Sequence, residues 1–109
     1  MIKTFSDREA EKIWNQQRSK RLPFSIQQRV LNKLAMISQA VDLNDLRIPP
    51  ANRLETLTRD RSGQHSIQTN QQWRICFRWK EGNAYDLRKA RAETGAVIES
   101  QVAPRWVAA

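Results

Sequence analysis

The segment from residue 73 to residue 80 combines large apolar side chains with cations in strict alternation. Its apolar members are Trp73, Ile75, Phe77 and Trp79, and the residues between them are Arg74, Cys76, Arg78 and Lys80. Because successive side chains of a β-strand point to opposite faces, the pattern predicts a strand with one apolar and one cationic face. Alternate side chains lie about 7 Å apart, close to the distance between successive phosphates of a nucleic acid. The segment therefore predicts a surface for a nucleic-acid backbone, with a solvated face kept soluble by its charge as the alternative.

Further cations precede this strand. Residues 53–80 contain only two acids, Glu55 and Asp60, against six cations, which are Arg53, Arg59, Arg61, Arg74, Arg78 and Lys80. Arginine prevails here, and its guanidinium makes planar, two-pronged contacts with phosphate. The whole chain of 109 residues has 19 Lys and Arg against 11 Asp and Glu, a formal net charge of +8. We therefore expect an acidic partner, with nucleic acid before an acidic protein.

His65 is the only histidine in the chain, and histidine is the residue type whose ordinary pKa lies near neutrality. On the cationic face, neighbouring charges would lower the pKa of His65 and leave a neutral imidazole that accepts a proton from a ribose 2′-hydroxyl. The alternative is a half-buried histidine that packs on a neighbour, because strand parity places His65 on the same face as Ile67, the expected core side. Both interpretations stay open on the sequence.

The sequence predicts no metal site and no cofactor. His65 and Cys76 are eleven residues apart and form no recognised ligand set, and no glycine-rich phosphate loop occurs. The single cysteine cannot form an internal disulfide, which makes a cytoplasmic location the expectation. No apolar run approaches the roughly 20 residues of a membrane span, and residues 1–5 do not resemble a signal peptide.

Two helices are predicted in the first half of the chain, over residues 7–20 and 25–41. A capping box is expected at the start of each, in residues 6–9 and 25–28, where side-chain oxygens can accept from free amide N–H groups. The second helix has an apolar stripe at helical spacing, formed by Ile26, Val30, Leu34, Ile37 and Val41. The short linker predicts a helical hairpin, and the weak alternation of residues 1–5 indicates a strand before it.

The second half of the chain predicts an antiparallel sheet. Strands are expected at residues 54–57, 64–69, 73–80 and 84–87, with turns at residues 70–72 and 81–83. The helical hairpin would cover the apolar face of this sheet, which makes the fold class α+β. Residues 1–87 are interpreted as one domain. Residues 88–109 are an atypical tail, helical by propensity from residue 88 to residue 93 and then disordered.

Three stretches of the chain resemble the HigB-type toxins of the RelE/ParE superfamily. They are Pro49-Pro50-Ala51-Asn52-Arg53-Leu54-Glu55-Thr56-Leu57, Asp60-Arg61-Ser62-Gly63-Gln64-His65-Ser66-Ile67 and Asn70-Gln71-Gln72-Trp73-Arg74-Ile75-Cys76-Phe77-Arg78-Trp79. With residues 1–5 and 33–50, the resemblance covers residues 1–86. It implies a RelE-like twisted antiparallel sheet with two N-terminal helices packed on one face.

The resemblance implies the toxin of a type II toxin–antitoxin system, with a helix-turn-helix antitoxin as its partner. The toxin would contact operator DNA only through this antitoxin. Such toxins enter the ribosome and cut mRNA in the A site, and no membrane is involved. Arg74 and Arg61 would be catalytic, with His65 as a proton acceptor, because the family relies on basic residues to stabilise charge on the scissile phosphate. The cations expected to bind RNA are Arg53, Arg59, Arg78 and Lys80.

Two alternatives stay open, and departures from the family pattern support the first of them. Thr58 and Gln68 stand where relatives commonly have cations, and the C-terminal Asp-Tyr-His of relatives is absent. One alternative is therefore a weakened or inactive homologue that still binds its antitoxin and takes part in operator repression. The other is a ParE-like toxin that targets gyrase, although the Gln-His-Ser-Ile and Trp-Arg motifs argue against that branch.

Overall fold

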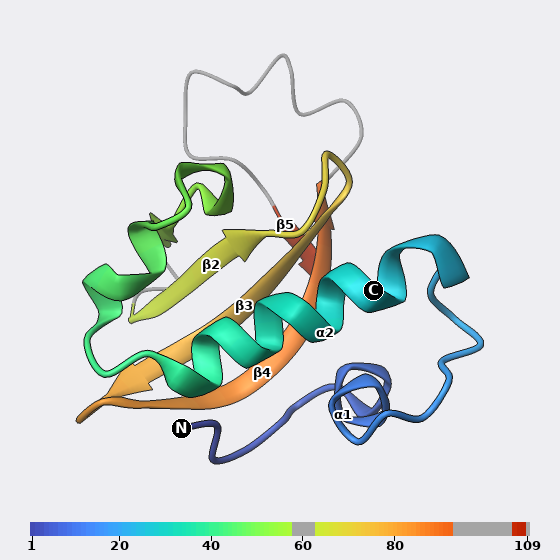
Figure 1. Cartoon of the computed structure of the whole chain (residues 1–109), viewed down its shortest axis with the longest axis horizontal. Coiled ribbons are helices and arrows are strands. Elements are labelled where there is room, and N and C mark those ends of the chain that lie inside the picture. Colours follow the sequence, from blue (N-terminus) through green and yellow to red (C-terminus); the bar gives the residue numbers. More distant parts are fainter. Residues whose placement is uncertain (58–62, 93–105, 109) are drawn as a thin grey trace.

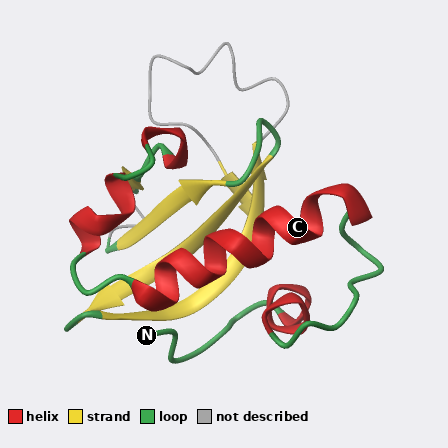
Figure 2. Ribbon diagram, viewed as in Figure 1, coloured by secondary structure: helices red, strands yellow, loops and turns green. Residues whose placement is uncertain are grey.

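The computed structural model describes residues 1–57, 63–92 and 106–108. Its elements in chain order are α1 (Arg8–Trp14), α2 (Phe24–Gln39), the 3₁₀ helices η1 (Leu43–Arg47) and η2 (Pro50–Asn52), and the strands β1 (Glu55–Thr56), β2 (Gln64–Gln68), β3 (Trp73–Lys80), β4 (Asn83–Ala92) and β5 (Trp106–Ala108). α2 lies across the sheet, and both α-helices contribute to one apolar core with it (Figures 1 and 2). The predicted α+β fold with two N-terminal helices on one face of an antiparallel sheet is confirmed.

The sheet runs in the order β1-β2-β3-β4-β5, and all neighbouring strands are antiparallel. Arg78 pairs with Tyr85 and Cys76 pairs with Arg88, so two residues of β4 lie opposite one residue of β3. This extra residue is a β-bulge, which bends a strand and redirects its side chains. Asp86, within the bulge, has a left-handed φ of 55°. The strand pattern is therefore interrupted beside the cations of β3.

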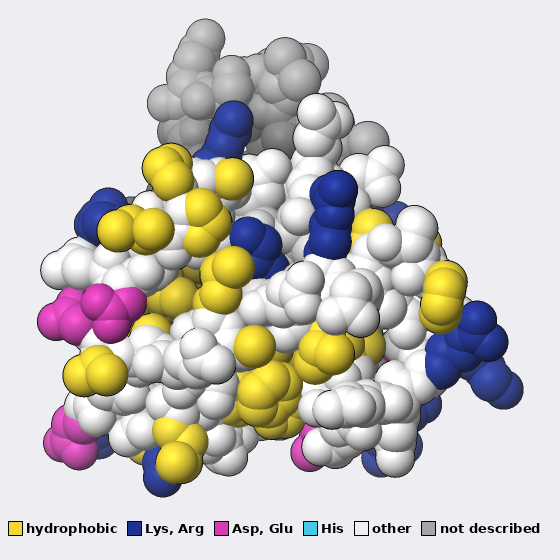
Figure 3. Space-filling model, in the orientation of Figure 1, with side chains coloured by type: hydrophobic (Ala, Val, Ile, Leu, Met, Phe, Trp, Pro, Cys, Tyr) yellow, Lys and Arg dark blue, Asp and Glu magenta, His cyan; other side chains and the backbone are white. Residues whose placement is uncertain are grey.

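The core lies between α2 and the sheet. α2 contributes four of the five residues of its predicted apolar stripe, and the strands contribute the apolar residues predicted to face it. The fifth, Val41, is exposed because α2 ends at Gln39. The central members are Val30, Leu34, Ile37, Ile67, Ile75, Phe77 and Leu87. Burying each side chain of this size contributes roughly 1.5–3 kcal/mol, which makes this contact the main reason that the helix stays on the sheet. Outside the core, hydrophobic side chains on this side of the molecule are scattered among polar ones (Figure 3).

Both helices are shorter than the sequence predicts, and both expected capping boxes are wrong. α1 ends at Trp14, and Gln16 then adopts a left-handed φ of 61° that breaks the helical path. At its start, the Asp7 carboxylate accepts from the Glu9 amide at 2.9 Å, so Asp7 is the cap in place of Ser6. α2 begins at residue 24, with no side-chain hydrogen bond at its cap.

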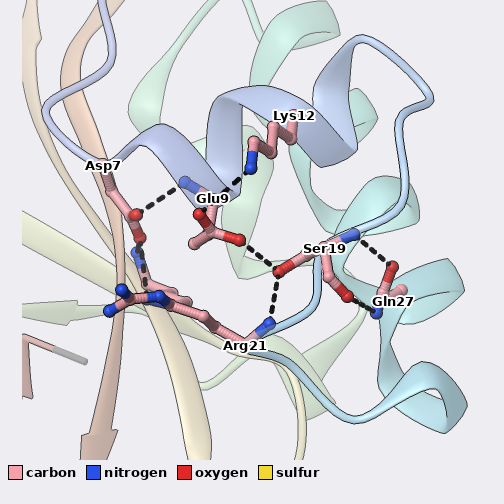
Figure 4. Close-up of polar contacts among 7 residues, drawn as sticks. Asp7, Glu9, Lys12, Ser19, Arg21 and Gln27 are labelled. Carbon is pink, nitrogen blue, oxygen red and sulfur yellow. Dashed lines mark hydrogen bonds and ion pairs between the residues drawn. The ribbon is translucent and has the colours of Figure 1, made fainter.

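The side chain of Gln27, expected to lie in the second capping box, instead fixes the loop between the helices (Figure 4). Its Nε2 donates to the carbonyl oxygens of Ser19 and Leu22 at 2.8 and 2.9 Å. Its Oε1 accepts from the Ser19 amide at 3.1 Å. The Ser19 hydroxyl in turn donates to the Glu9 carboxylate at 2.6 Å. The loop therefore has a defined shape, although no helix extends through it.

The expectation of a helix at residues 88–93 is wrong for the part that the structure describes. Residues 88–92 continue β4, where Arg88 to Arg91 pair with Cys76 to Trp73 of β3. Backbone pairing with β3 outweighs the helical propensity of this segment. The expected tail from residue 93 lies outside the described residues, except for β5, and the domain boundary at residue 87 stays a prediction. Residues 1–5 form only two isolated parallel bridges to β4, through Ile2 and Phe5.

Candidate nucleic-acid interface

The sheet has a second face, turned away from the helices, which we call the distal face. On this face β3 contributes Arg74, Cys76, Arg78 and Lys80, and β4 contributes Tyr85 and Arg88, as the register and the alternation of side chains require. The predicted separation of apolar and cationic faces along β3 is therefore correct in parity. The cations differ sharply in their exposure, however, and this difference decides which of them can meet a ligand.

Arg74 is buried, which contradicts the expectation of an exposed cation beside Arg78. Only 2% of its surface is exposed. Its Nε donates to the Ser66 hydroxyl at 2.8 Å and its Nη2 donates to the Ser66 carbonyl at 3.1 Å. Nη2 also donates to the carbonyl oxygen of Arg53, and Nη1 lies 3.9 Å from the Glu55 carboxylate. The guanidinium therefore binds the protein's own acceptors and joins the end of η2 to strands β1 and β2 of the sheet.

The residues around Arg74 account for this burial. The distal face has an apolar cluster of its own at this end, formed by Leu57, Cys76 and Ala90. Burial lowers the pKa of Arg74, while the neighbouring Glu55 carboxylate acts in the opposite direction. Because an arginine stays protonated even so, its charge has to be matched by internal acceptors. The strand pattern predicts the side to which Arg74 points but not the depth at which it lies.

Arg78 is the cation of β3 that the structure presents to solvent, with 51% of its side chain exposed. Its Nε lies 3.4 Å from the Asp86 carboxylate. Its Nη1 lies 3.7 Å from the point where a Cβ on Gly63 would stand, so the guanidinium extends toward the turn that precedes β2. Lys80 is also exposed, two residues further along the same face. These two cations form the described centre of the candidate interface.

The remaining predicted cations divide into two groups. Arg53 is exposed and has a left-handed φ of 45° at the end of η2, and its carbonyl oxygen accepts from Arg74. Arg59 and Arg61 lie outside the described residues. Sequence reasoning missed Arg88, which the register places on the distal face, and Asp86, which pairs with Arg78. The sequence pattern does not indicate either position, because the places of Arg88 and Asp86 depend on the path of β4 beside β3.

His65 lies on the helix side of the sheet, as strand parity indicated. Its ring centroid is 6.0 Å from that of Phe77, a member of the core. Its Nδ1 is 3.1 Å from the Thr56 hydroxyl oxygen. Burial lowers the pKa of His65, and this cause differs from the expected effect of neighbouring cations. The structure therefore does not bring His65 together with Arg78, and its catalytic role stays a prediction.

Within residues 1–57, 63–92 and 106–108, no group of three His, Cys, Asp or Glu side chains could hold a metal ion. No described helix is both long enough and apolar enough to cross a membrane.

A small antiparallel sheet with two N-terminal helices on one face is the fold that the resemblance to RelE-like toxins implies. A family profile described as RelE-like toxin of type II toxin-antitoxin system HigB matches residues 3–89. The chain is 38% identical over 85 residues to Toxin HigB-1 of Vibrio cholerae serotype O1, a match that covers 77% of this chain and 90% of that protein. It is 34% identical over 67 residues to an uncharacterized protein of Haemophilus influenzae, covering 62% of this chain and 66% of that protein.

The chain therefore belongs to the HigB-like family of type II toxins. Membership of a toxin–antitoxin system implies an antitoxin as its partner.

Proposed function

We propose that this HigB-family protein is a ribosome-dependent endoribonuclease that cuts mRNA in the ribosomal A site and acts in the cytoplasm. The family match over residues 3–89 is the observation that carries the proposal. The exposed cations Arg78 and Lys80 on the distal face support it, because such side chains can bind successive phosphates of an RNA backbone. A helix-turn-helix antitoxin would restrain the toxin and carry it to operator DNA.

Within this function, we assign the RNA-binding role to Arg78, Lys80 and Arg53, which are exposed, and to Arg59. Catalysis would rest on charge stabilisation at the scissile phosphate, to which Arg61 and His65 stay candidate contributors. Arg74 would support this surface from within, because its donors hold the backbone at Arg53 and the strand that carries Ser66.

The second candidate function is a weakened or inactive homologue that binds its antitoxin and helps to repress the operator. Two observations favour it: the burial of Arg74 and the position of His65 on the opposite face from Arg78. Both remove a predicted catalytic group from the exposed distal face. The gyrase-targeting alternative has no observation of this kind in its favour.

Expression of the chain alone, under tight control in a bacterial host, separates these candidates. We expect growth arrest and new mRNA 5′ ends within translated codons, both strongly reduced but still measurable in Arg78→Ala. Normal growth with intact mRNA would contradict the nuclease and favour the inactive homologue. Arrest with intact mRNA and damaged DNA would instead indicate action on gyrase.

A further inference from the structure

Asp86 occupies an unusual position in the β-bulge of β4. Its φ of 55° lies in the left-handed region, which residues other than glycine seldom adopt. Asp and Asn tolerate this region better than other side chains, so the residue type fits the backbone. Bulges and positive φ values of this kind are found preferentially where a side chain has to be directed to a particular place.

The N-terminal segment holds the bulge in this conformation. The Thr4 hydroxyl oxygen accepts from the Asp86 amide at 2.8 Å, and the same hydroxyl lies 3.3 Å from Asp86 Oδ1, to which it donates. The Ser6 hydroxyl donates to the Asp86 carbonyl oxygen at 3.1 Å. One carboxylate oxygen and both backbone polar groups of Asp86 are therefore occupied by Thr4 and Ser6. The second carboxylate oxygen, Oδ2, is left to face Arg78 at 3.4 Å.

The guanidinium of Arg78 lies between two fixed points. On one side its Nε faces Asp86 Oδ2, and on the other its Nη1 passes close to Gly63. Among the described residues, neither Nη group has a hydrogen-bond partner. Nη1 and Nη2 together form the fork with which arginine binds phosphate. The Asp86 carboxylate thus restrains one edge of the guanidinium and leaves the phosphate-binding edge available.

We propose that Asp86 is a positioning residue that orients Arg78 toward the RNA phosphate at which cleavage occurs. The inference rests on the proposed function. It gives Arg78 a part in charge stabilisation at the scissile phosphate besides its RNA-binding role, and it adds Asp86 as the residue that orients Arg78. The carboxylate also offsets part of the positive charge of Arg78, so it weakens the general attraction for RNA while it fixes direction. An interaction that stabilises the transition state more than the bound substrate raises kcat without tightening binding. Asp86 is therefore expected to contribute to kcat and not to RNA affinity.

Asp86→Asn tests this inference, because asparagine tolerates the left-handed backbone and removes only the charge. With bacterial ribosomes programmed with a short mRNA, we expect kcat to fall about tenfold or more, as misplacement of a catalytic group does. The KM is expected to stay the same or to decrease. Asp86→Gly relaxes the backbone but also lacks the carboxylate, so it should lose activity to the same extent. Glu81→Asn is the matched control, since Glu81 also has a left-handed φ, 53°, and does not pair with Arg78.

A double-mutant cycle shows whether Asp86 acts through Arg78. Asp86→Asn should have no further effect on kcat in an Arg78→Ala background. An equal loss in both backgrounds would overturn the inference, as would a rate for Asp86→Asn equal to that of Glu81→Asn. In the free protein, the Nε–Hε NMR resonance of Arg78 should shift in Asp86→Asn and stay in place in Glu81→Asn.

The inference and the proposed function can fail separately. If the wild-type chain cleaves while the cycle is additive, the function stands and the role of Asp86 is refuted. If the wild-type chain cleaves nothing, the proposed function is refuted. In that case two measurements on the free protein still test the role of Asp86. It is overturned if Asp86→Asn leaves the Arg78 resonance in place, or if Arg78→Ala leaves the affinity for a short single-stranded RNA unchanged.

Discussion

At the scale of single residues, Arg74 and Arg78 show how one strand gives two arginines different tasks. They share a face of β3, but Arg74 donates to internal oxygens and Arg78 extends into solvent. The alternating pattern of residues 73–80 predicts the shared face correctly. It cannot predict burial, because that depends on residues 53 and 66, which approach Arg74 only in the folded chain.

Replacement of Arg74 should destabilise the protein. Arg74→Ala leaves the Ser66 and Arg53 carbonyl oxygens without this donor, and we expect the free energy of unfolding to fall by about 3 kcal/mol. Arg74→Lys should recover only part of the loss, because an ammonium cannot reproduce the guanidinium fork. Urea denaturation measures both, and the exposed Lys80→Ala should change stability by less than about 0.5 kcal/mol. An Arg74→Ala protein of wild-type stability would contradict the internal role.

His65 should make stability dependent on pH in the mildly acidic range. Its folded pKa is lowered by burial from an ordinary value of 6.5, so above that pH the imidazole is neutral in both states. As the pH falls below that value, the unfolded chain takes up the proton first, and the free energy of unfolding decreases until the folded pKa is reached. Urea denaturation between about pH 5 and pH 7 measures this slope. His65→Gln should flatten this dependence of stability on pH. An unchanged slope would refute its assignment to His65.

At the scale of elements, the loop between α1 and α2 is defined by a side chain and not by its backbone pattern. The sequence predicts helices here, and four of the five residues of the expected apolar stripe are buried in α2. The helix ends are misplaced, however, and Val41 lies exposed beyond α2. α1 ends early because Gln16 adopts a left-handed φ. The expected capping box of α2 is absent, and the Gln27 side chain donates to the loop instead. Such contacts join residues eight apart in the chain, as Ser19 and Gln27 are, and leave no periodic signal.

Gln27→Ala should loosen this loop. It removes the bonds that Gln27 makes with both backbone groups of Ser19, which is buried, and with Leu22. We expect a loss of about 1–2 kcal/mol in the free energy of unfolding. Gln28→Ala is the matched control, because among the described residues exposed Gln28 bonds only to Asn32 on the same helix. Equal effects of the two substitutions in urea denaturation would contradict the account.

β4 illustrates the opposite case, in which pairing outweighs local preference. The sequence predicts a strand that ends at residue 87 and a helix after it, whereas β4 continues to Ala92. The bulge at Asp86 lets the strand continue beside β3 after a change of register. Neither the bulge nor its bonds to Thr4 can be predicted from periodicity, because these partners are 82 residues apart.

At the scale of the molecule, the net charge of +8 is not gathered on one surface. Lys and Arg side chains also stand at several separate places on the helix side (Figure 3). Composition therefore indicates an acidic partner but does not locate its site. The fold class and the family could be predicted from the sequence, whereas the exposed cations had to be identified from the structure.

The distal face should bind RNA mainly through its charges. Lys80→Ala is expected to reduce the slope of log Kd against log salt by about one and to weaken binding of different RNA sequences alike. Fluorescence anisotropy with short single-stranded RNAs measures this slope. An unchanged slope would show that Lys80 does not contact a phosphate.

The most direct test of the proposed nuclease uses the purified chain, a labelled mRNA and programmed bacterial ribosomes. We expect cleavage in the A-site codon that requires the ribosome and is strongly reduced in Arg78→Ala, while Glu81→Asn cleaves as the wild type does. Intact mRNA with the wild-type chain, or equal cleavage by Arg78→Ala, would contradict this expectation.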